Sequence, residues 1–315
     1  MRYRTLGITG LEISEIGFGG FAIGGLDYGP TDDRESLAAL ERAYELGVTF
    51  FDTSDMYGEG RSESLIGRVL KGKHPPGVVA TKVGFVGKRG RHQGKDFSRS
   101  HILAAVDQSL RRLQREAIDL YQIHNPELSD VENGEVFGIM DDLAAAGKVR
   151  FWGVSVKSRD SLQVARRAMA WPSAASVQII CNIFRRRDLG ELHEEIRQRG
   201  IGVVARAPLE YGMLTGKFSP GACFAPGDHR IWRWETEEFS RRLPQVETLR
   251  KAFNEKFLSL AQLAIGFALS YPDVSVVICG AKRPSQVEEN VAASGLLGEI
   301  LTETDLRRVQ EIIPA

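Results

Sequence analysis

The sequence contains few cysteines, no surplus of charge of either sign and no long apolar run. Its 315 residues include three cysteines, Cys181, Cys223 and Cys279, an odd and sparse set that argues against a disulfide framework and is not spaced as a metal site. Lys plus Arg and Asp plus Glu both total 41, so the net charge gives no reason to expect a nucleic-acid partner. No apolar run approaches roughly 18 residues, and the first residues carry no apolar signal core. We therefore expect a cytoplasmic protein without a membrane or metal partner.

Short apolar stretches alternate with helical patterns along the whole sequence. Counted from Ile16, eight strands are expected, at residues 16–20, 48–52, 78–81, 120–123, 148–154, 177–180, 201–205 and 274–278. Helices are expected between them, at residues 36–46, 62–70, 98–113, 134–146, 161–169, 189–199 and 258–270, with another beginning near Pro284. Strands and helices in alternation indicate a parallel sheet. Strands that are almost wholly apolar fit a sheet that is covered on both faces.

Eight strand–helix units predict an α/β fold, a closed (β/α)8 TIM barrel, in which residues 1–315 form a single domain. Residues 3–6 and 11–13 flank a glycine-containing turn and predict an N-terminal β-hairpin. After strand 7, residues 208–258 show no clear strand and predict a long functional or mobile loop. The alternative, an open doubly wound sheet, is disfavoured because Gly17-Phe18-Gly19-Gly20 lacks the Gly-x-Gly-x-x-Gly spacing of dinucleotide-binding turns.

Ionisable side chains stand at several of the expected strand ends. Asp52, Lys82 and His124 each lie where an apolar stretch ends, and Tyr57 follows in the loop after Asp52. The active site of a (β/α)8 barrel lies at the C-terminal ends of its strands, so these groups should converge. Packing alone does not explain so many ionisable groups in equivalent positions. Together they predict a proton-transfer site.

Five stretches of the sequence, in order and spanning nearly the whole chain, resemble the aldo-keto reductase family. They are residues 51–58 (FDTSDMYG), 80–84 (ATKVG), 119–124 (DLYQIH), 147–155 (GKVRFWGVS) and 280–290 (GAKRPSQVEEN). The resemblance implies a nicotinamide-dependent oxidoreductase that reduces an aldehyde or ketone to an alcohol, or catalyses the reverse. The family's four catalytic positions fall on Asp52, Tyr57, Lys82 and His124.

The chemistry of these residues agrees with those roles. Reduction of a carbonyl needs a hydride on carbon and a proton on oxygen. A tyrosine has a pKa of about 10, and a nearby cation lowers that pKa because it favours the phenolate. We expect Lys82 to be that cation, Asp52 to hold its ammonium, and His124 to orient the substrate oxygen. Tyr57 is then the acid in reduction and the base in oxidation.

The resemblance also implies a cofactor held without a Rossmann fold. Ser155 and Gln178 correspond to residues that bind the carboxamide, although Val156 replaces a common asparagine. Arg206 stands where many relatives have a tyrosine that stacks on the nicotinamide, and a guanidinium plane can also stack. Other expected contacts lie in the loops after strand 1, at Gly20 and Phe21, and after strand 7, at Leu209, Gly212 and Leu214.

The last matching stretch resembles the family's site for the adenosine 2′-phosphate. Residues 280–283, Gly280, Ala281, Lys282 and Arg283, lead into a helix, and a helix N-terminus with two cations can bind an anion. Gln286 replaces a common arginine, and we expect Lys282 and Arg283 to take its place. Glu289 and Asn290 match adenine contacts. NADPH is thus favoured over NADH.

Substrate contacts are expected from Tyr57, His124, Phe85 and Trp232, with weaker candidates at Phe21, Tyr28 and Asn125. The substrate is expected to be a small carbonyl compound, alcohol or sugar, and the oligomeric state cannot be deduced. Three further groups are given no catalytic part: His229 and residues 185–187 (Arg-Arg-Arg) are expected at the solvated surface, and Asp55, to which no partner is assigned, in a loop or turn.

Two other functions remain open from the sequence. A lyase could use Lys82 as a Schiff-base nucleophile. A regulatory subunit could bind the nicotinamide cofactor and turn over slowly.

Overall fold

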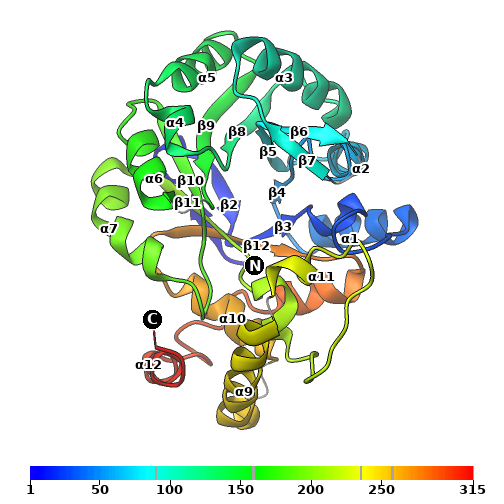
Figure 1. Ribbon diagram of the computed structural model, residues 1–315, viewed down its shortest axis with the longest axis vertical. Coiled ribbons are helices and arrows are strands. Elements are labelled where there is room, and N and C mark those ends of the chain that lie inside the picture. The colour runs from blue at the N-terminus through cyan, green and yellow to red at the C-terminus, as the bar shows by residue number, and fades with distance from the viewer. Residues whose placement is uncertain (89–90, 158–159, 235, 257–258, 315) are drawn as a thin grey trace.

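Eight parallel strands close into a barrel, as the sequence predicts (Figure 1). This computed structural model describes residues 1–88, 91–157, 160–234, 236–256 and 259–314, apart from the side chains of residues 88, 91–93, 232, 233 and 236. The last strand pairs with the first, Val277 opposite Ile16. In chain order the barrel strands are β3 (Ile16–Gly19), β4 (Phe50–Asp52), β5 (Val78–Val83), β8 (Ile118–His124), β9 (Val149–Ser155), β10 (Ala174–Ile180), β11 (Gly202–Arg206) and β12 (Val274–Gly280).

Side chains that point into the barrel change from apolar to polar along the strands. Because successive side chains alternate across a strand, residues two apart share a face. Phe50 and Ala80 pack in one apolar cluster, and Asp52 and Lys82 follow them at this spacing. The barrel therefore has an apolar floor beneath a polar layer at the C-terminal ends of its strands.

The predicted N-terminal hairpin, β1 (Tyr3–Thr5) and β2 (Glu12–Ser14), closes the floor from below. Leu6 and Ile13 join the apolar cluster inside the barrel. The turn approaches the barrel closely, since a Cβ on Gly7 would lie 2.2 Å from the backbone nitrogen of Gly202. Gly7 also has φ +48°, so this turn requires glycine for both space and backbone conformation.

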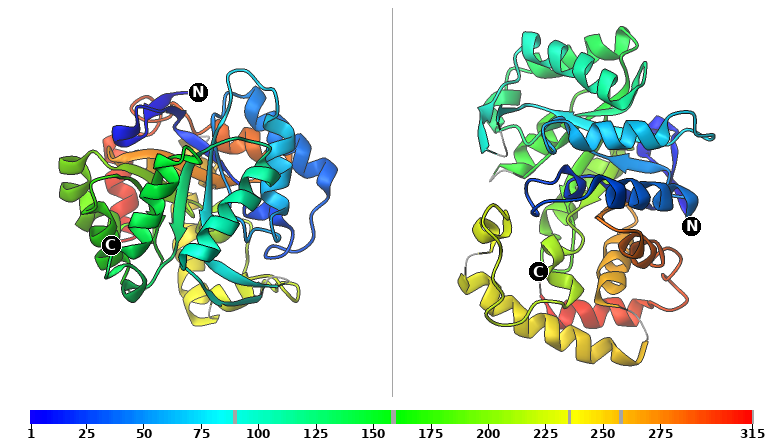
Figure 2. Two further views of the ribbon diagram at one scale, coloured as in Figure 1. Left: turned by 90° about the horizontal axis from the view of Figure 1, so that it is seen from above. Right: turned by 90° about the vertical axis from the view of Figure 1, so that its right-hand side faces the viewer.

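Helices surround the barrel and cover the outer faces of its strands (Figures 1 and 2). Local signals set their ends: the Asp32 carboxylate accepts from the Glu35 N–H at 3.0 Å, and Ser259 forms a capping box with Gln262. The predicted helices correspond to α1 (Asp33–Glu45), α2 (Arg61–Leu70), α3 (Arg99–Leu113), α5 (Glu135–Ala145), α6 (Ser161–Met169), α7 (Arg187–Arg199), α10 (Leu260–Leu269) and α11 (Pro284–Val291).

The connection after strand 7 is only partly a loop, which corrects the expectation for residues 208–258. It contains α8 (Arg230–Arg233) and the long helix α9 (Thr236–Phe253). The apolar side of α9, including Phe239 and Leu249, forms a second core with the unpredicted C-terminal helix α12 (Glu303–Ile312), which lies beside it (Figures 1 and 2). Pro244 lies inside α9, and a proline in a helical pattern normally marks an end. The packing of α9 against this second core overrides that local signal.

Other short elements follow the barrel strands and were not predicted. A hairpin of β6 (Phe85–Lys88) and β7 (Arg91–Lys95) follows β5, and the one-turn helix α4 (Leu128–Val131) follows β8. The β6–β7 hairpin places the Phe85 ring 4.8 Å from the His124 ring, measured between centroids. It therefore forms one wall of the region above the strand ends.

The expectation of a solvated loop for the arginine run 185–187 holds only for Arg187, which is exposed. Arg186 is buried and donates to the carbonyl oxygens of Ile183 and Ile313. Arg185 donates to the Glu210 carboxylate at 2.5 Å. Arg186 thus fastens the segment around Ile313, and Arg185 the loop after β11, to the barrel.

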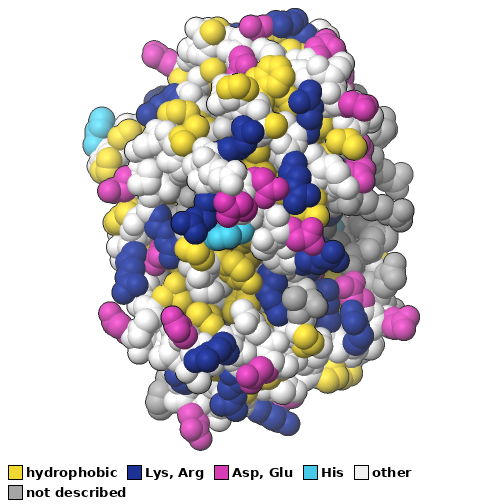
Figure 3. All heavy atoms as spheres, turned by 90° about the vertical axis from the view of Figure 1, so that its left-hand side faces the viewer, with side chains coloured by type: hydrophobic (Ala, Val, Ile, Leu, Met, Phe, Trp, Pro, Cys, Tyr) yellow, Lys and Arg dark blue, Asp and Glu magenta, His cyan; other side chains and the backbone are white. Residues whose placement is uncertain are grey.

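The outer surface carries both signs of charge. Acidic and basic side chains are interspersed over the face drawn in Figure 3. Within the described residues, no helix is both long and apolar enough to cross a membrane, and no cluster of His, Cys, Asp and Glu has the makings of a metal site.

A nearly buried carboxylate, Glu15, ties the hairpin to the rest of the barrel. Its oxygens accept from Arg4 Nε at 3.1 Å, from Ser294 Oγ at 2.8 Å and from the Gly295 N–H at 3.2 Å. Arg4 in turn donates to the Val274 carbonyl at 2.8 Å. One carboxylate thus links the first and last segments of the chain.

Replacing Glu15 by alanine should strongly destabilise the protein, because the Arg4 guanidinium and two further donors lose their acceptor. We expect the free energy of unfolding to fall by about 3 kcal/mol, measured as a lower midpoint of urea unfolding. The matched control is Glu45→Ala, which breaks an exposed pair with Arg42 and should leave the unfolding midpoint nearly unchanged. Equal losses in the two variants would contradict the linking role of Glu15.

Candidate active site

Asp52 and Lys82 form a buried ion pair at the centre of the polar layer. The Lys82 side chain is fully buried, and its Nζ donates to Asp52 Oδ1 at 2.6 Å. The same ammonium donates to the Thr53 carbonyl at 2.7 Å and to the Tyr57 hydroxyl at 3.4 Å. Gln178 Nε2 donates to the second Asp52 oxygen at 2.7 Å. A buried charge is tolerated when every partner is supplied in this way.

Gln122 is a further neighbour of Asp52 that sequence reasoning missed. Its Nε2 donates to Asp52 Oδ2 at 3.4 Å. Gln122 precedes His124 by two residues on β8, so the two side chains share the inner face. The two-residue spacing from His124 was therefore the sequence signal that could have identified Gln122 as a residue of the site.

Tyr57 reaches the ion pair from the loop between β4 and α2. Its backbone N–H donates to the Ser54 carbonyl at 3.1 Å, and Lys82 Nζ lies 4.9 Å from its ring centroid. Burial raises the pKa of Tyr57 more than the Lys82 charge lowers it, so the net pKa lies above the ordinary value. The expected net lowering was wrong, because desolvation of the phenolate outweighs the attraction of the ammonium.

His124 ends β8 beside Tyr57, with 6.0 Å between the two ring centroids. Its Nδ1 lies 3.2 Å from Ser54 Oγ, and Ser54 Oγ donates to Asp55 Oδ1 at 3.0 Å. Ser54 is thus the hydrogen-bond partner of Asp55, to which none was assigned from the sequence. Burial first, and then the nearby Glu63 carboxylate, raise the pKa of Asp55 to about 7.

A cavity of about 660 Å³ opens above these strand ends. It runs from Tyr57 and His124 to Lys282 and Gln286, a size typical of small-molecule sites. Its lining includes these predicted residues: Phe21, Asp52, Tyr57, Phe85, His124, Gln178, Arg206, Leu209, Gly212, Gly280, Ala281, Lys282 and Gln286. The structure thus brings most of the predicted positions to one space.

The other predicted positions that the structure describes lie behind that lining or outside it: Gly20, Lys82, Ser155, Leu214, Arg283, Glu289 and Asn290. Ser155 Oγ donates to Gln178 Oε1 at 3.2 Å, so Ser155 contacts a lining residue without lining the cavity itself. Leu214 is buried in the second core, and Asn290 Nδ2 donates to the Gly280 carbonyl at 3.4 Å. Glu289 and Arg283 are exposed. The side chain of Trp232, predicted as a substrate contact, lies outside the described part of the chain.

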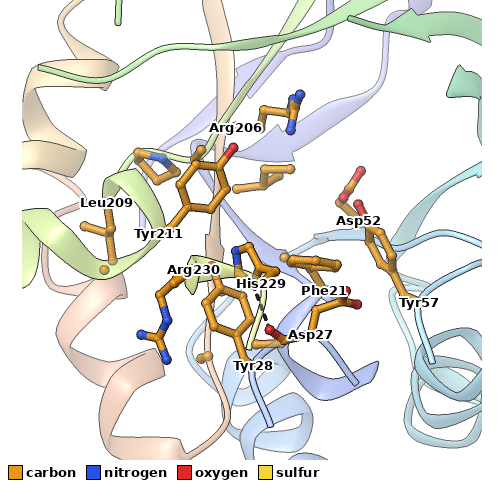
Figure 4. Close-up of a pocket in the computed structure, with 18 of the residues that line it drawn as sticks. Phe21, Asp27, Tyr28, Asp52, Tyr57, Arg206, Leu209, Tyr211, His229 and Arg230 are labelled. Atoms are coloured by element: carbon orange, nitrogen blue, oxygen red, sulfur yellow. Dashed lines mark hydrogen bonds between the residues drawn. The ribbon is translucent and has the colours of Figure 1, made fainter. Parts of the chain in front are cut away.

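His229 lines the cavity and is buried, so its expected surface position was wrong. Its backbone N–H donates to the Asp27 carbonyl oxygen at 2.8 Å, and its ring Nδ1 lies 2.8 Å from the same oxygen (Figure 4). The rings of Tyr28 and Phe21 lie 4.3 and 5.4 Å away, between centroids. The two contacting residues are 202 positions apart in sequence, and no local pattern predicts their contact.

Several more lining residues were not predicted as contacts, among them Asp27, Met56, Lys157, Tyr211, Lys217 and Arg230. Arg206, Lys217, Arg230 and Lys282 place positive charge along the cavity. Partial burial, followed by the nearby Arg230 guanidinium, lowers the pKa of both Lys217 and Lys282. Such crowding of cations favours an anionic ligand.

The loop that carries Tyr211 has an unusual backbone. Ala207, Glu210 and Tyr211 have φ of +52°, +44° and +55°, values that residues with a side chain rarely adopt. The buried Glu210 carboxylate accepts from Arg185 Nη2 at 2.5 Å and from Arg242 Nη1 at 2.9 Å. These ion pairs hold the strained turn against the cavity.

Comparisons with known proteins agree with this geometry. A sequence model of the Aldo/keto reductase family matches residues 15–314. The chain belongs to the aldo-keto reductase family. The members of this family are oxidoreductases that reduce carbonyl compounds, so both the expected family and the expected fold class are confirmed.

Individual relatives resemble this aldo-keto reductase over almost its full length. The aldo-keto reductase YhdN of Bacillus subtilis is 32% identical over 319 residues, covering 99% of this chain and 94% of the relative. A probable voltage-gated potassium channel subunit beta of Arabidopsis thaliana is 30% identical over 331 residues, covering 99% and 97%. Among solved structures, a glycerol dehydrogenase from Gluconobacter oxydans has a TM-score of 0.83 and 28% identity, covering 98% and 94%.

The buried ion pair of this aldo-keto reductase predicts a stability effect. Asp52→Asn leaves the Lys82 ammonium buried without its anion, so the free energy of unfolding should fall by about 3–5 kcal/mol. The double variant Asp52→Asn with Lys82→Met removes the orphaned charge and should regain most of that loss. Thermal unfolding of the three proteins measures this. A double variant that is no more stable than Asp52→Asn would show that charge burial is not the cause.

Proposed function

We propose that this protein is an NADP(H)-dependent oxidoreductase that interconverts an aldehyde or ketone and the corresponding alcohol, with Tyr57 as the proton donor and acceptor. The observation that carries the proposal is the Tyr57 hydroxyl, 3.4 Å from the buried Lys82 ammonium and at the wall of the cavity. His124 lines the same end. A carbonyl oxygen placed there meets both an acid and a second polar group.

The shape and charge of the cavity support a nicotinamide dinucleotide as the cofactor. Lys217, Arg230 and Lys282 would face its phosphates, whereas Arg206, whose charge acts on Tyr57, would lie at the nicotinamide end. Gly212, with φ +97°, lines the wall and lets the backbone come close to a ligand. When bound, the cofactor supplies the hydride that reduces the carbonyl carbon.

Within the part of the chain that the structure describes, the buried Asn125 Oδ1 has no hydrogen-bond partner, and Asn125 lines the cavity. A buried acceptor without a donor is costly unless a ligand satisfies it. The carboxamide of a nicotinamide and the hydroxyl of an alcohol both offer such a donor.

The residues divide the proton chemistry among them. The raised pKa of Tyr57 keeps its hydroxyl protonated before reduction. Once the proton passes to the substrate oxygen, the phenolate that remains is stabilised by Lys82, whose position Asp52 fixes at 2.6 Å. In alcohol oxidation the same phenolate accepts the proton. His124 orients the substrate oxygen from the neighbouring strand end.

A Schiff-base lyase is disfavoured by the surroundings of Lys82. Its ammonium donates to Asp52, Thr53 and Tyr57, and Lys82 is absent from the described lining of the cavity. A nucleophilic amine must be neutral and must reach the substrate. The Lys82 amine is instead held as an ion pair with Asp52 and does not reach the described cavity wall.

A regulatory role is the second candidate, because the chain resembles a probable potassium channel subunit beta. Such a protein would bind NADPH and turn over slowly. The likeness to a glycerol dehydrogenase supports small alcohols or their carbonyl forms as substrates. A panel of aldehydes, ketones and sugars with NADPH decides between the two roles. Tight NADPH binding without turnover on any substrate favours the regulatory role.

Tyr57→Phe should abolish turnover and spare cofactor binding, because it removes the transferred proton while the ring remains. We expect kcat to fall by at least about 10²-fold and the Kd of NADPH, from quenching of protein fluorescence, to change by less than about threefold. The control is Tyr44→Phe, whose hydroxyl bonds to the Pro75 carbonyl at 3.0 Å outside the cavity. Full activity in Tyr57→Phe removes Tyr57 as the acid.

Lys282→Ala should weaken NADPH more than NADH, because Lys282 lies at the phosphate end of the proposed site. A charged hydrogen bond to phosphate is worth about 1.5–3 kcal/mol, so the Kd of NADPH should rise by about 10- to 100-fold. The Kd of NADH should rise much less. Arg42→Ala serves as the control, since Arg42 pairs with Glu288 on α11 outside the cavity. Equal weakening of the two cofactors would remove the 2′-phosphate role.

A further inference from the structure

A short hydrogen-bonded chain lies behind His124, on the side away from the cavity. Ser54 Oγ is 3.2 Å from His124 Nδ1 and 3.0 Å from Asp55 Oδ1. Tyr57 and His124 line the described cavity wall, and neither Ser54 nor Asp55 does. Asp55 therefore does not touch a substrate there, and Ser54 links it to His124.

The Ser54 hydroxyl has one proton to donate and lies between the Asp55 carboxylate and Nδ1 of His124. When Asp55 is ionised, its carboxylate can only accept, so Ser54 donates to it and must accept a hydrogen bond from Nδ1–H of His124. A neutral His124 then has its proton on Nδ1 and none on Nε2. When Asp55 is protonated, the Ser54 hydroxyl is free to donate to Nδ1, and the proton of His124 moves to Nε2.

We propose that Asp55 is a positioning residue that selects, through the Ser54 hydroxyl, which ring nitrogen of His124 carries the proton. This rests on the proposed function of His124, since a hydrogen bond to a substrate carbonyl requires a proton on Nε2. Two arrangements meet that need: protonated Asp55 with neutral His124, and ionised Asp55 with cationic His124. Both hold one proton more than the arrangement that fails.

The groups around Asp55 bring its pKa close to neutral pH. Burial and the Glu63 carboxylate raise the pKa of Asp55 to about 7, against opposing effects of Ser54, the Met56 N–H and Arg112. Glu63 is itself paired with Arg112 at 2.6 Å, which leaves that cation largely engaged. From β8, the buried Tyr121 side chain also faces Asp55. From β5, Lys82 offers Asp55 only its backbone carbonyl, at 3.4 Å, because its ammonium is bound to Asp52.

The consequence is a pH limit on carbonyl reduction that Tyr57 does not cause. The pKa of Tyr57 lies above its ordinary value, so Tyr57 stays protonated through the neutral range. As pH rises through about 7, Asp55 ionises, and the Ser54 hydroxyl then requires that Nδ1 of a neutral His124, not Nε2, carry the ring proton. Loss of a donor to a developing oxyanion lowers kcat by about 10²-fold. We expect that loss in reduction between pH 6 and 9.

The test follows His124 directly by ¹⁵N NMR of the full chain labelled at histidine, because the two tautomers give different nitrogen shifts. His124 is assigned from the signal lost in His124→Gln. In the wild type, Nε2 should carry the proton at pH 6 and Nδ1 at pH 8.5. In Asp55→Asn, which cannot ionise, no change between tautomers should occur near pH 7. Asp142→Asn, at an exposed pair with Arg99, should behave as the wild type.

Ser54→Ala supplies an independent arm. Without the hydroxyl, His124 should lose the step near pH 7, and adding Asp55→Asn to Ser54→Ala should change the spectrum no further. The same variants are assayed for the pH dependence of kcat with NADPH and a substrate from the carbonyl panel. Asp55→Asn should keep its reduction rate to within about threefold from pH 6 to 9, whereas the wild type falls by about 10²-fold.

Identical tautomers and pH profiles in the wild type and Asp55→Asn would overturn the proposal. A further change on adding Asp55→Asn to Ser54→Ala would also overturn it, because the effect would then bypass the hydroxyl. The NMR arm needs no turnover. Failure of the proposed enzymatic function would therefore show as absent activity with the tautomer switch intact.

Discussion

The buried contact between the Lys82 ammonium and the Asp52 carboxylate is the interaction on which the site depends. An ammonium inside a barrel is tolerated only if each of its donors meets an acceptor, and Asp52, the Thr53 carbonyl and Tyr57 supply them. The need for those partners holds β4, β5 and the loop after β4 in one arrangement. It also keeps a positive charge beside the Tyr57 hydroxyl. The arrangement of these strands and the proposed proton chemistry therefore depend on the same contact.

The two ends of the cavity are built in different ways. At the proposed catalytic end, side chains come from neighbouring parallel strands, and the barrel fixes their spacing. At the other end the wall consists of loops far apart in sequence. His229 Nδ1 lies 2.8 Å from the Asp27 carbonyl oxygen (Figure 4), and Lys282 Nζ donates to the Tyr28 carbonyl at 2.8 Å. Loops joined by a few hydrogen bonds open more easily than strands in a closed sheet. Substrate and cofactor would thus meet a rigid floor and a more adaptable rim.

The errors made from sequence share a cause. Strand ends were placed well because alternation and glycine-ended helices are local signals, and Asp52, Lys82 and His124 follow from them. The positions of His229 and Arg186 depend on contacts with segments that lie elsewhere in the chain. The pKa of Asp55 depends on the groups packed around it, although its hydrogen-bond partner is the adjacent residue Ser54. Helix α9 was missed because Pro244 obscures its apolar face, and only the partner helix α12 shows that this face is covered. The roles of the residues remain proposals, whereas their convergence is observed.

The sequence by itself determined the eight-stranded barrel, the family and the strand ends at which ionisable groups gather, since these depend on periodicity and on motifs of a few neighbouring residues. Only the tertiary structure decided the electrostatics. The pKa of Tyr57 rises although Lys82 is near, and that of Asp55 reaches about 7, because burial depends on everything packed around a group. The sequence shows which ionisable groups are present. How deeply each group is buried decides whether it is protonated or ionised at a given pH.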